Sequence, residues 1–361
     1  MTLLSAPPQT TDTSATADSR ARRGSDFAVL CRKVRAAGLL ERRHGSYVLR
    51  ISATLAAYAA AWAAFWWLGN SWLQLITAGV LGLLFTQVAF LGHDGGHQQI
   101  VRGRRGNELL SVVAGNLLVG LSFGWWADKH NRHHARPNHE GHDPDIGDGV
   151  LAFTNDQIAA RHAGLGRFIA RHQAALFFPL LTLEGLNLHV AAARFLLSGA
   201  SRTGRYRRLE IALFAIHTVA YVSALLLVLG PVKALAFFAV HQAVFGLYMG
   251  CSFAPNHKGM PTIPADEKLD FLRRQVLTSR NVRGGWFTDL LLGGLNYQIE
   301  HHLFPSMPRD NLRAARLLVR AHCTERAISY TETSLFGSYR IVLSHLHALG
   351  APLRVRAIQA S

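Results

Sequence analysis

The sequence predicts an all-α integral membrane protein, in which four transmembrane helices form two hairpins and a cytoplasmic helical cap holds a metal site. Three observations predict this fold class. Four apolar runs have about the 20 residues that a helix needs to cross a bilayer. Very short turns join these runs in pairs, and clusters of histidines recur beside the apolar runs.

The four runs define the predicted hairpins. The first hairpin comprises residues 51–69 and 72–92 around Asn70-Ser71, and the second comprises residues 209–230 and 232–253 around Gly230-Pro231. Of the 38 lysines and arginines, only Lys233 falls in an outer turn. Because basic residues concentrate on the cytoplasmic side, both termini and every histidine cluster are predicted to be cytoplasmic.

Two further apolar runs, at 109–126 and 174–190, contain polar residues and could each form another span. We predict in-plane helices on the cytoplasmic face instead. If only one of the two runs crossed the membrane, the histidine clusters would fall on opposite sides and the metal site would be split.

These runs give three predicted regions. Residues 1–45 form a disordered basic cytoplasmic tail, residues 46–325 the membrane domain, and residues 326–361 a cytoplasmic C-terminal extension. The first 25 residues are rich in Ser, Thr, Ala, Pro and Arg and lack the apolar core of a signal peptide. A transit peptide remains an alternative, against which Asp12 and Asp18 count.

Composition narrows the function classes. The net charge is +16, but the basic residues surround apolar segments, so membrane lipid is the expected partner and nucleic acid is not. Cys31, Cys251 and Cys323 are scattered and form no CxxC pair, which gives neither a disulfide framework nor an iron–sulfur site.

Three histidine clusters, here called the first, second and third histidine boxes in chain order, share helical spacing. They are His93-Asp94-Gly95-Gly96-His97, His130-Asn131-Arg132-His133-His134 and Gln298-Ile299-Glu300-His301-His302. Residues separated by three or four positions lie on one face of a helix, so each box can aim two or three side chains at one point. Seven histidines are too many for one four-coordinate zinc and suit a two-metal centre.

The sequence around these boxes resembles the membrane fatty acid desaturase family, and its acyl-lipid and front-end branch in particular. The similar segments are HNRHHARPNHEGHDPDI (130–146), FAPNHKGMP (253–261) and LNYQIEHHLFP (295–305). The resemblance covers roughly residues 45–325. It implies an enzyme that uses two iron ions and O2 to insert a cis double bond into a fatty acyl chain.

The resemblance also implies site residues. The seven box histidines become iron ligands, His257 is the expected eighth ligand, and Gln298 and Asn256 are expected to hold a metal or a metal-bound water. Ligating imidazoles usually donate their other N–H to a carboxylate or carbonyl. The acidic residues near the boxes that can accept such bonds are Asp94, Asp128, Asp143, Asp145, Asp289 and Glu300, of which Asp143 and Asp145 form the best-matched pair.

Other histidines are not assigned to iron. His139 and His142 follow Pro137, which breaks the helical phase of the second box, and a surface or supporting role is favoured. His189, His217 and His241 lie in apolar segments, where a buried polar group needs a partner. We expect them to form hydrogen bonds or to line the substrate path.

The substrate would reach the metal site through an apolar tunnel. Its expected walls are Phe123, Trp125, Trp126 and Phe237, with Phe65, Trp66, Trp67 and Phe238 as further candidates; lipid-facing or core packing is the alternative for each. The chain contains no His-Pro-Gly-Gly heme motif, so electrons are expected from an external ferredoxin, reductase or cytochrome b5.

The sequence leaves two alternatives to desaturation. A hydroxylase or ketolase on the same di-iron scaffold would act on a lipid, alkane or carotenoid, and the QIEHHLFP wording favours desaturation over it. A metal carrier would place its ligands within the spans, whereas here they lie at span ends and in loops.

Overall fold

The computed structural model describes residues 26–198 and 204–358, most of which are helical. Four helices are long and apolar enough to cross a membrane: α2 (His44–Leu68), α3 (Gln74–Gly96), α9 (Arg207–Val228) and α10 (Pro231–His257). These are the four helices that the sequence predicts. Their ends differ by up to seven residues, because hydropathy marks only the apolar part of a helix and polar turns extend α2 and α10 beyond it.

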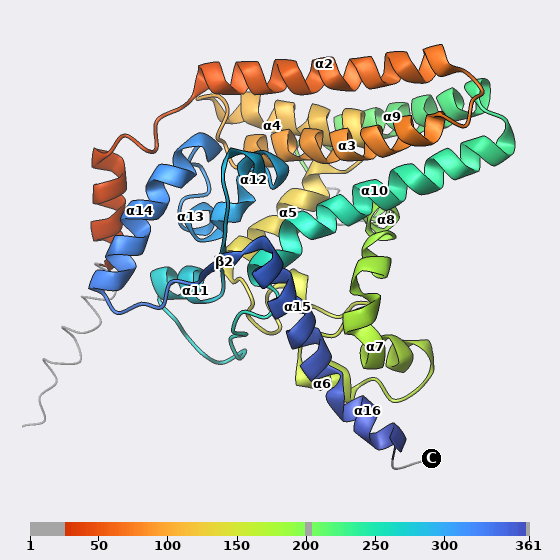
Figure 1. Ribbon diagram of the computed structural model, residues 1–361. Helices are drawn as coiled ribbons and strands as arrows, with labels where there is room; N and C mark the ends of the chain where they lie inside the picture. Colours follow the sequence, from red (N-terminus) through yellow and green to blue (C-terminus); the bar gives the residue numbers. More distant parts are fainter. Residues whose placement is uncertain (1–25, 199–203, 359–361) are drawn as a thin grey trace, which may run out of the picture.

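The two hairpin turns lie against each other at one end of this bundle (Figure 1). The Gly230 amide donates to Asn70 Oδ1 at 3.2 Å, and Lys233 Nζ donates to the Asn70 carbonyl at 2.8 Å. Along the bundle, α3 packs between α2 and α10. A Cβ at Gly82 would lie 3.0 Å from the His241 carbonyl, so α3 and α10 approach closely only because this residue is glycine.

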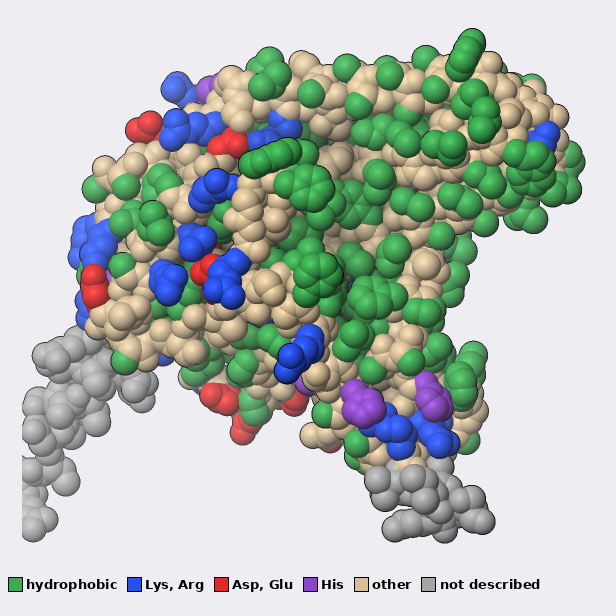
Figure 2. All heavy atoms as spheres, viewed as in Figure 1, with side chains coloured by type: hydrophobic (Ala, Val, Ile, Leu, Met, Phe, Trp, Pro, Cys, Tyr) green, Lys and Arg blue, Asp and Glu red, His purple; other side chains and the backbone are tan. Residues whose placement is uncertain are grey.

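The outer faces of the four helices are apolar and exposed. Trp67 is 85% exposed and Leu227 is 78% exposed. Figure 2 shows hydrophobic side chains along the long helices, whereas most Lys and Arg side chains in this view lie away from the end that carries the hairpin turns. An exposed apolar surface of this extent marks contact with a membrane or with another protein.

The two ambiguous apolar runs form bent helix pairs. In the first, α4 (Arg104–Val112) continues into a π-helix, η1 (Val113–Val119), before α5 (Phe123–Ala135) turns away by 116°. In the second, α7 (Gly164–Leu181) and α8 (Glu184–Leu197) meet at 80°. Neither run is therefore one straight helix.

The remaining helices are shorter than these four long helices. They are η2 (Pro144–Ile146), α6 (Asn155–Ala159), α11 (Phe271–Leu277), α12 (Trp286–Leu291), η4 (Leu295–Tyr297), α13 (Gln298–Leu303), α14 (Arg309–Glu325), α15 (Leu335–Leu349) and α16 (Ala351–Ile358). One departure from the all-α prediction is a parallel pair of three-residue strands, β1 (Asn281–Arg283) and β2 (Glu332–Ser334), with Asn281 opposite Glu332.

The N-terminal region also departs from the sequence prediction. A disordered tail is predicted through residue 45, but residues 26–36 form a helix. Leu30 and Val34 are fully buried in one cluster with Val319 and Cys323 of α14. The physical reason is this tertiary contact, which turns a short, basic segment into part of the cap. Residues 1–25 lie outside the described part of the chain.

Candidate metal centre

The histidine boxes lie where helices end. His93 is in the last turn of α3, with His97 directly after that helix; the second box occupies the last two turns of α5, and His257 ends α10. The third box forms the short buried helix α13. Three helices thus direct their C-terminal ends, which carry partial negative charge, toward one place. This arrangement stabilises positive charge there.

One group of imidazoles comes from the first and third boxes and the start of the second. Ligand atoms of His93, His97, His130 and His301 all lie within 4.8 Å of one another. The Nε2 atoms of His97 and His130 are 2.9 Å apart. His134 joins this group, because its Nε2 is 3.0 Å from that of His130 and 3.1 Å from that of His301.

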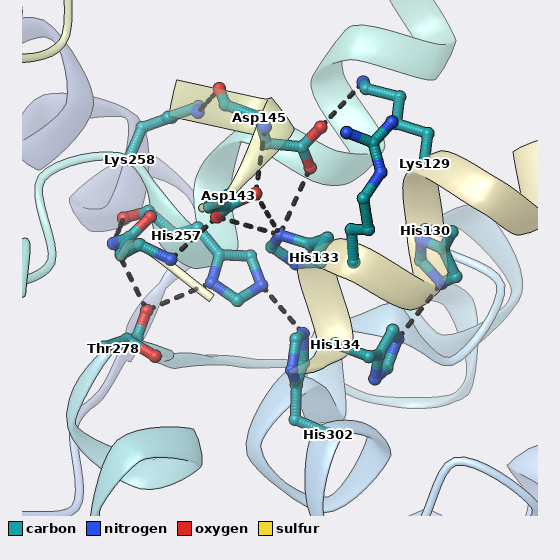
Figure 3. Close-up of polar contacts among 12 residues, drawn as sticks. Lys129, His130, His133, His134, Asp143, Asp145, His257, Lys258, Thr278 and His302 are labelled. Carbon is teal, nitrogen blue, oxygen red and sulfur yellow. Dashed lines mark hydrogen bonds and ion pairs between the residues drawn. The ribbon is translucent and has the colours of Figure 1, made fainter. Parts of the chain in front are cut away.

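A second group lies beside the first. Ligand atoms of His133, His257 and His302 lie within 4.8 Å of one another, and the Nε2 atoms of His257 and His302 are 3.0 Å apart. Figure 3 shows these rings turned toward one another, with His134 between them and His130. The ring centroids of His134 and His302 are 4.2 Å apart, so the two groups are contiguous.

Hydrogen bonds fix the orientation of the second group. Nδ1 of His133 lies 3.0 Å from both carboxylate oxygens of Asp143, and Nδ1 of His257 donates to the Thr278 carbonyl at 3.0 Å. Nδ1 of His302 donates to Gln275 Oε1 at 2.9 Å. These oxygens only accept, so each Nδ1 carries the proton and each Nε2 presents a lone pair.

The converging lone pairs fit a cation. Two Nε2 lone pairs 3.0 Å apart, on His257 and His302, repel each other unless a positive ion lies between or beside them. In the first group, His93 Nε2 is buried without a hydrogen-bond partner among the described residues. Neutral imidazole is a ligand for iron, copper, zinc and nickel. The donor set therefore fits transition-metal ions and disfavours an empty polar core.

The charge state of the imidazoles agrees with this fit. Burial, followed by repulsion from neighbouring imidazoles, holds the pKa values of His97, His130, His134, His301 and His302 well below the usual range. These side chains are therefore neutral near pH 7, which is the form that binds a metal.

His133 is the exception. Burial lowers its pKa, but the charges of Asp145 and Asp143 and the Asp143 hydrogen bond outweigh burial and raise it. Asp145 in turn contacts Lys129 Nζ at 2.6 Å, and its carbonyl accepts from Lys258 Nζ (Figure 3). The carboxylates of Asp143 and Asp145 thus place negative charge beside His133, which is a member of the second group.

Asp94 supports the first group through an ion pair. Its carboxylate lies 3.6 Å from His93 Nδ1 and accepts from Arg309 Nε at 2.5 Å. Arg309 also donates to the Phe90 carbonyl at 3.0 Å, which ties the start of α14 to the last turns of α3. Removing one partner of a buried pair leaves an uncompensated charge, so both residues are needed together.

Gln298 and Asn256 lie beside the second group. The Gln298 amide nitrogen is 2.9 Å from His257 Nε2, and its oxygen accepts from Asn256 Nδ2 at 3.3 Å. In this orientation Gln298 presents its nitrogen to His257. Coordination of a metal by its oxygen would require the amide to rotate by half a turn.

Three of the expected carboxylates lie elsewhere. Asp128 pairs with Arg132 at 2.8 Å, and both side chains are more than half exposed. Glu300 is buried, but its described hydrogen bonds come from Asn281 at 2.7 Å and Tyr330 at 2.8 Å. Asp289 accepts from Arg313 and Asn296. Proximity in sequence misplaces these residues, because neighbours on a helix point in different directions.

The supporting residues that sequence reasoning missed are Gln275, the Thr278 carbonyl, Arg309, Lys129 and Lys258. Gln275 lies on α11 and Thr278 follows it, and each is more than 20 residues from the histidine it contacts, so their role becomes visible only in the fold.

An apolar cavity borders the first group. It encloses about 490 Å³ of empty space when its open mouth is included, and its lining is mostly apolar. Of the expected walls, Phe123 and Trp126 line it, together with His93, Met249 and Phe253. Trp125 and Phe237 are not among the lining residues; Phe237 is fully buried against Phe65, with ring centroids 5.3 Å apart.

Fold and site together define a membrane-type helical protein with a buried histidine centre that fits metal ions. Comparison with known sequences gives the same class: the family described as Fatty acid desaturase matches residues 70–334, which include all three boxes and His257. This chain belongs to the fatty acid desaturase family.

Several curated proteins are similar to the chain. An acyl-lipid (9-3)-desaturase of Physcomitrium patens is 32% identical over 295 residues, covering 80% of this chain and 56% of that protein. A Delta(6)-fatty-acid desaturase of Caenorhabditis elegans is 31% identical over 342 residues, covering 92% and 76%. A Delta(8)-fatty-acid desaturase of Euglena gracilis is 31% identical over 313 residues, covering 84% and 74%. The chain thus spans from about half to three quarters of these relatives.

Proposed function

We propose that this chain is an oxygen-dependent desaturase that inserts a cis double bond into a fatty acyl chain, with two iron ions held by the eight clustered histidines. The observation that carries the proposal is that the apolar cavity borders the two contiguous imidazole groups, because His93 of the first group lines this cavity. The relatives named for acyl-lipid, Delta(6) and Delta(8) desaturation support the same reaction.

Desaturation requires O2, two electrons from an external donor and a strong oxidant. Two C–H bonds break and a C=C bond forms, while O2 takes two electrons from the acyl chain and two from an external donor, with two further protons, to give two waters. When bound, the irons supply the oxidising power for C–H cleavage, which side chains lack. The proposed electron donor is a ferredoxin, a reductase or a cytochrome b5.

The residues of this chain would hold the two irons and orient the acyl chain. His93, His97, His130, His134 and His301 would hold one iron, and His133, His257 and His302 the other. Gln298 and Asn256 lie where they can hold a water beside the second iron. Asp143, Thr278 and Gln275 keep the second set of rings in the required tautomer. The apolar cavity orients the acyl chain and excludes water from His93.

We also propose that the four long helices cross the membrane with both termini and the histidine centre on the cytoplasmic side. The exposed apolar faces of these helices support insertion. The concentration of Lys and Arg away from the hairpin turns supports the orientation. The acyl chain would then enter the cavity from the membrane.

Product analysis tests the proposal. Fatty acid methyl esters from a host that expresses the full chain should contain a new unsaturated species, whose double-bond position is then located. His301→Ala should abolish this species, because it removes a ligand of the first group. His162→Ala, a change at an exposed loop histidine, should not. An oxygenated product, or the same unsaturated species in the His301→Ala host, would contradict desaturation at this centre.

A further inference from the structure

Residues 113–124, here called the cavity wall, comprise the π-helix η1 and the turn into α5. The cavity is lined by Gly115, Val119, Leu121, Ser122 and Phe123 of the cavity wall, together with Met249 and Phe253 of α10. π-Helical segments are rare and are frequently found at functional sites. The cavity wall therefore shapes the space beside His93, and whatever fixes its position also fixes that space.

Three consecutive carbonyls of the cavity wall lie within hydrogen-bond distance of side chains from three other helices. The Leu117 carbonyl bonds to His217 Nδ1 of α9 at 2.8 Å, and the Leu118 carbonyl accepts from the Tyr58 hydroxyl of α2 at 2.8 Å. The Val119 carbonyl lies 2.9 Å from His189 Nε2 of α8.

These carbonyls are the ones that need outside partners. The last carbonyls of a helix have no intrahelical donor, and in an apolar surrounding each unpaired group is costly. The fit is tight as well as polar: Gly120 has φ +78°, and a Cβ there would lie 2.5 Å from the His217 ring. The end of the π-helix is thus held in one position relative to α2, α8 and α9.

The same wall is tied to the metal centre. Glu210 of α9 accepts from the Ser122 hydroxyl at 2.7 Å and from the Gly124 amide at 2.9 Å, at the start of α5. The other end of α5 carries the second histidine box. A displacement of the cavity wall would therefore change the distance between cavity and imidazoles.

We propose that Tyr58, His189 and His217 are specificity-determining positioning residues. By fixing three carbonyls of the cavity wall, they determine how far an acyl chain enters and which of its carbons lies beside His93. This inference rests on the proposed desaturase function and goes beyond it, since it assigns selectivity for chain length to residues that contact neither the metal centre nor the cavity.

The test is a competition between two acyl chains that differ by two carbons, supplied together to a host that expresses the full chain. The ratio of the two unsaturated products is measured, so the amount of folded enzyme cancels. Tyr58→Phe removes only a hydroxyl and should change this ratio about threefold or more, the range expected for one hydrogen bond. Val119→Ala, which enlarges the cavity directly, should shift the ratio toward the longer chain by a similar factor.

Tyr206→Phe is the matched control, because its hydroxyl bonds to the Glu108 carboxylate at 3.0 Å and not to the cavity wall. It should keep the wild-type ratio. The inference is overturned if the Tyr58→Phe ratio equals that of the control, or, should Tyr58→Phe fail to accumulate, if Val119→Ala keeps the wild-type ratio. A wild-type chain that desaturates no acyl chain would instead overturn the proposed function, before any variant is compared.

Discussion

Asp143 and Asp128 are both acidic and lie on either side of the second histidine box, and the sequence analysis names both as possible partners of the imidazoles, with Asp143 preferred. The structure separates them. Asp143 is buried and accepts from His133 Nδ1 and from the backbone amides of Asn138 and Asp145. Asp128 forms an exposed i,i+4 pair with Arg132, which contributes little. What decides the role of a carboxylate here is the direction of its side chain.

This difference can be measured. Asp143→Asn removes the charge that orients His133 and should weaken iron binding about 10- to 100-fold, as loss of a ligand's hydrogen-bond partner generally does. Asp128→Asn should leave it unchanged. Competition with a chelator, on the purified full-length protein, gives both affinities. Equal affinities for the two variants would refute the orienting role of Asp143.

The raised pKa of Glu300 predicts that the stability of the fold depends on pH. Burial raises its pKa from the usual 4.5 to about 7, although hydrogen bonds from Asn281 and Tyr330 oppose the shift. The folded chain therefore holds this proton more tightly than the unfolded chain. The resulting stabilisation is complete below pH 4.5 and is lost as the pH rises through 7, an effect of about 3 kcal/mol at most.

Replacing Glu300 with glutamine removes this titration. Glu300→Gln should unfold at a temperature close to that of the wild type at pH 5 and at a higher temperature than the wild type at pH 8. The exposed change Glu267→Gln should show no such divergence. Thermal unfolding across this pH range measures both, and a difference for Glu300→Gln that does not vary with pH would rule out the shifted pKa.

At the scale of elements, α3 depends on a glycine contact. A Cβ at Gly82 meets the backbone of α10 at 3.0 Å, whereas a Cβ at Gly79, on the same helix, meets nothing within 4 Å. Gly82→Val should destabilise the protein by about 1–3 kcal/mol, the usual effect of overpacking. Gly79→Val should not. The midpoints of thermal unfolding compare the two, and equal midpoints would mean that α3 and α10 do not pack as described.

Hydropathy was sufficient to locate the four long helices, because an apolar run of this length has few alternatives. It could not reveal the bends between η1 and α5 or between α7 and α8, which depend on contacts with α9 and α10. The helix at residues 26–36 was missed for a related reason. Its sequence is short and basic, and only burial of Leu30 and Val34 against α14 explains it.

Across the whole molecule, the sequence predicts the histidines that meet and the supporting carboxylates Asp94, Asp143 and Asp145, but it does not predict the other supporting groups. The eight histidines come together because α3, α5 and α10 end at one place and α13 packs there. Gln275, Thr278 and Arg309 could not be found from the sequence, since each contacts a residue of the centre that is far away along the chain. Local spacing shows which histidines share one face of a helix, whereas most of the groups that hydrogen-bond to them are brought close only by the tertiary fold.

The eight clustered histidines are proposed to form one two-iron centre. The most direct test of this proposal is metal analysis of the purified full-length protein, with X-ray absorption at the iron edge. We expect about two iron ions per chain in a nitrogen-rich shell, as imidazole ligation requires. His257→Ala should lower this stoichiometry, and His162→Ala should not. A single bound zinc, or iron that is retained unchanged in His257→Ala, would contradict the account.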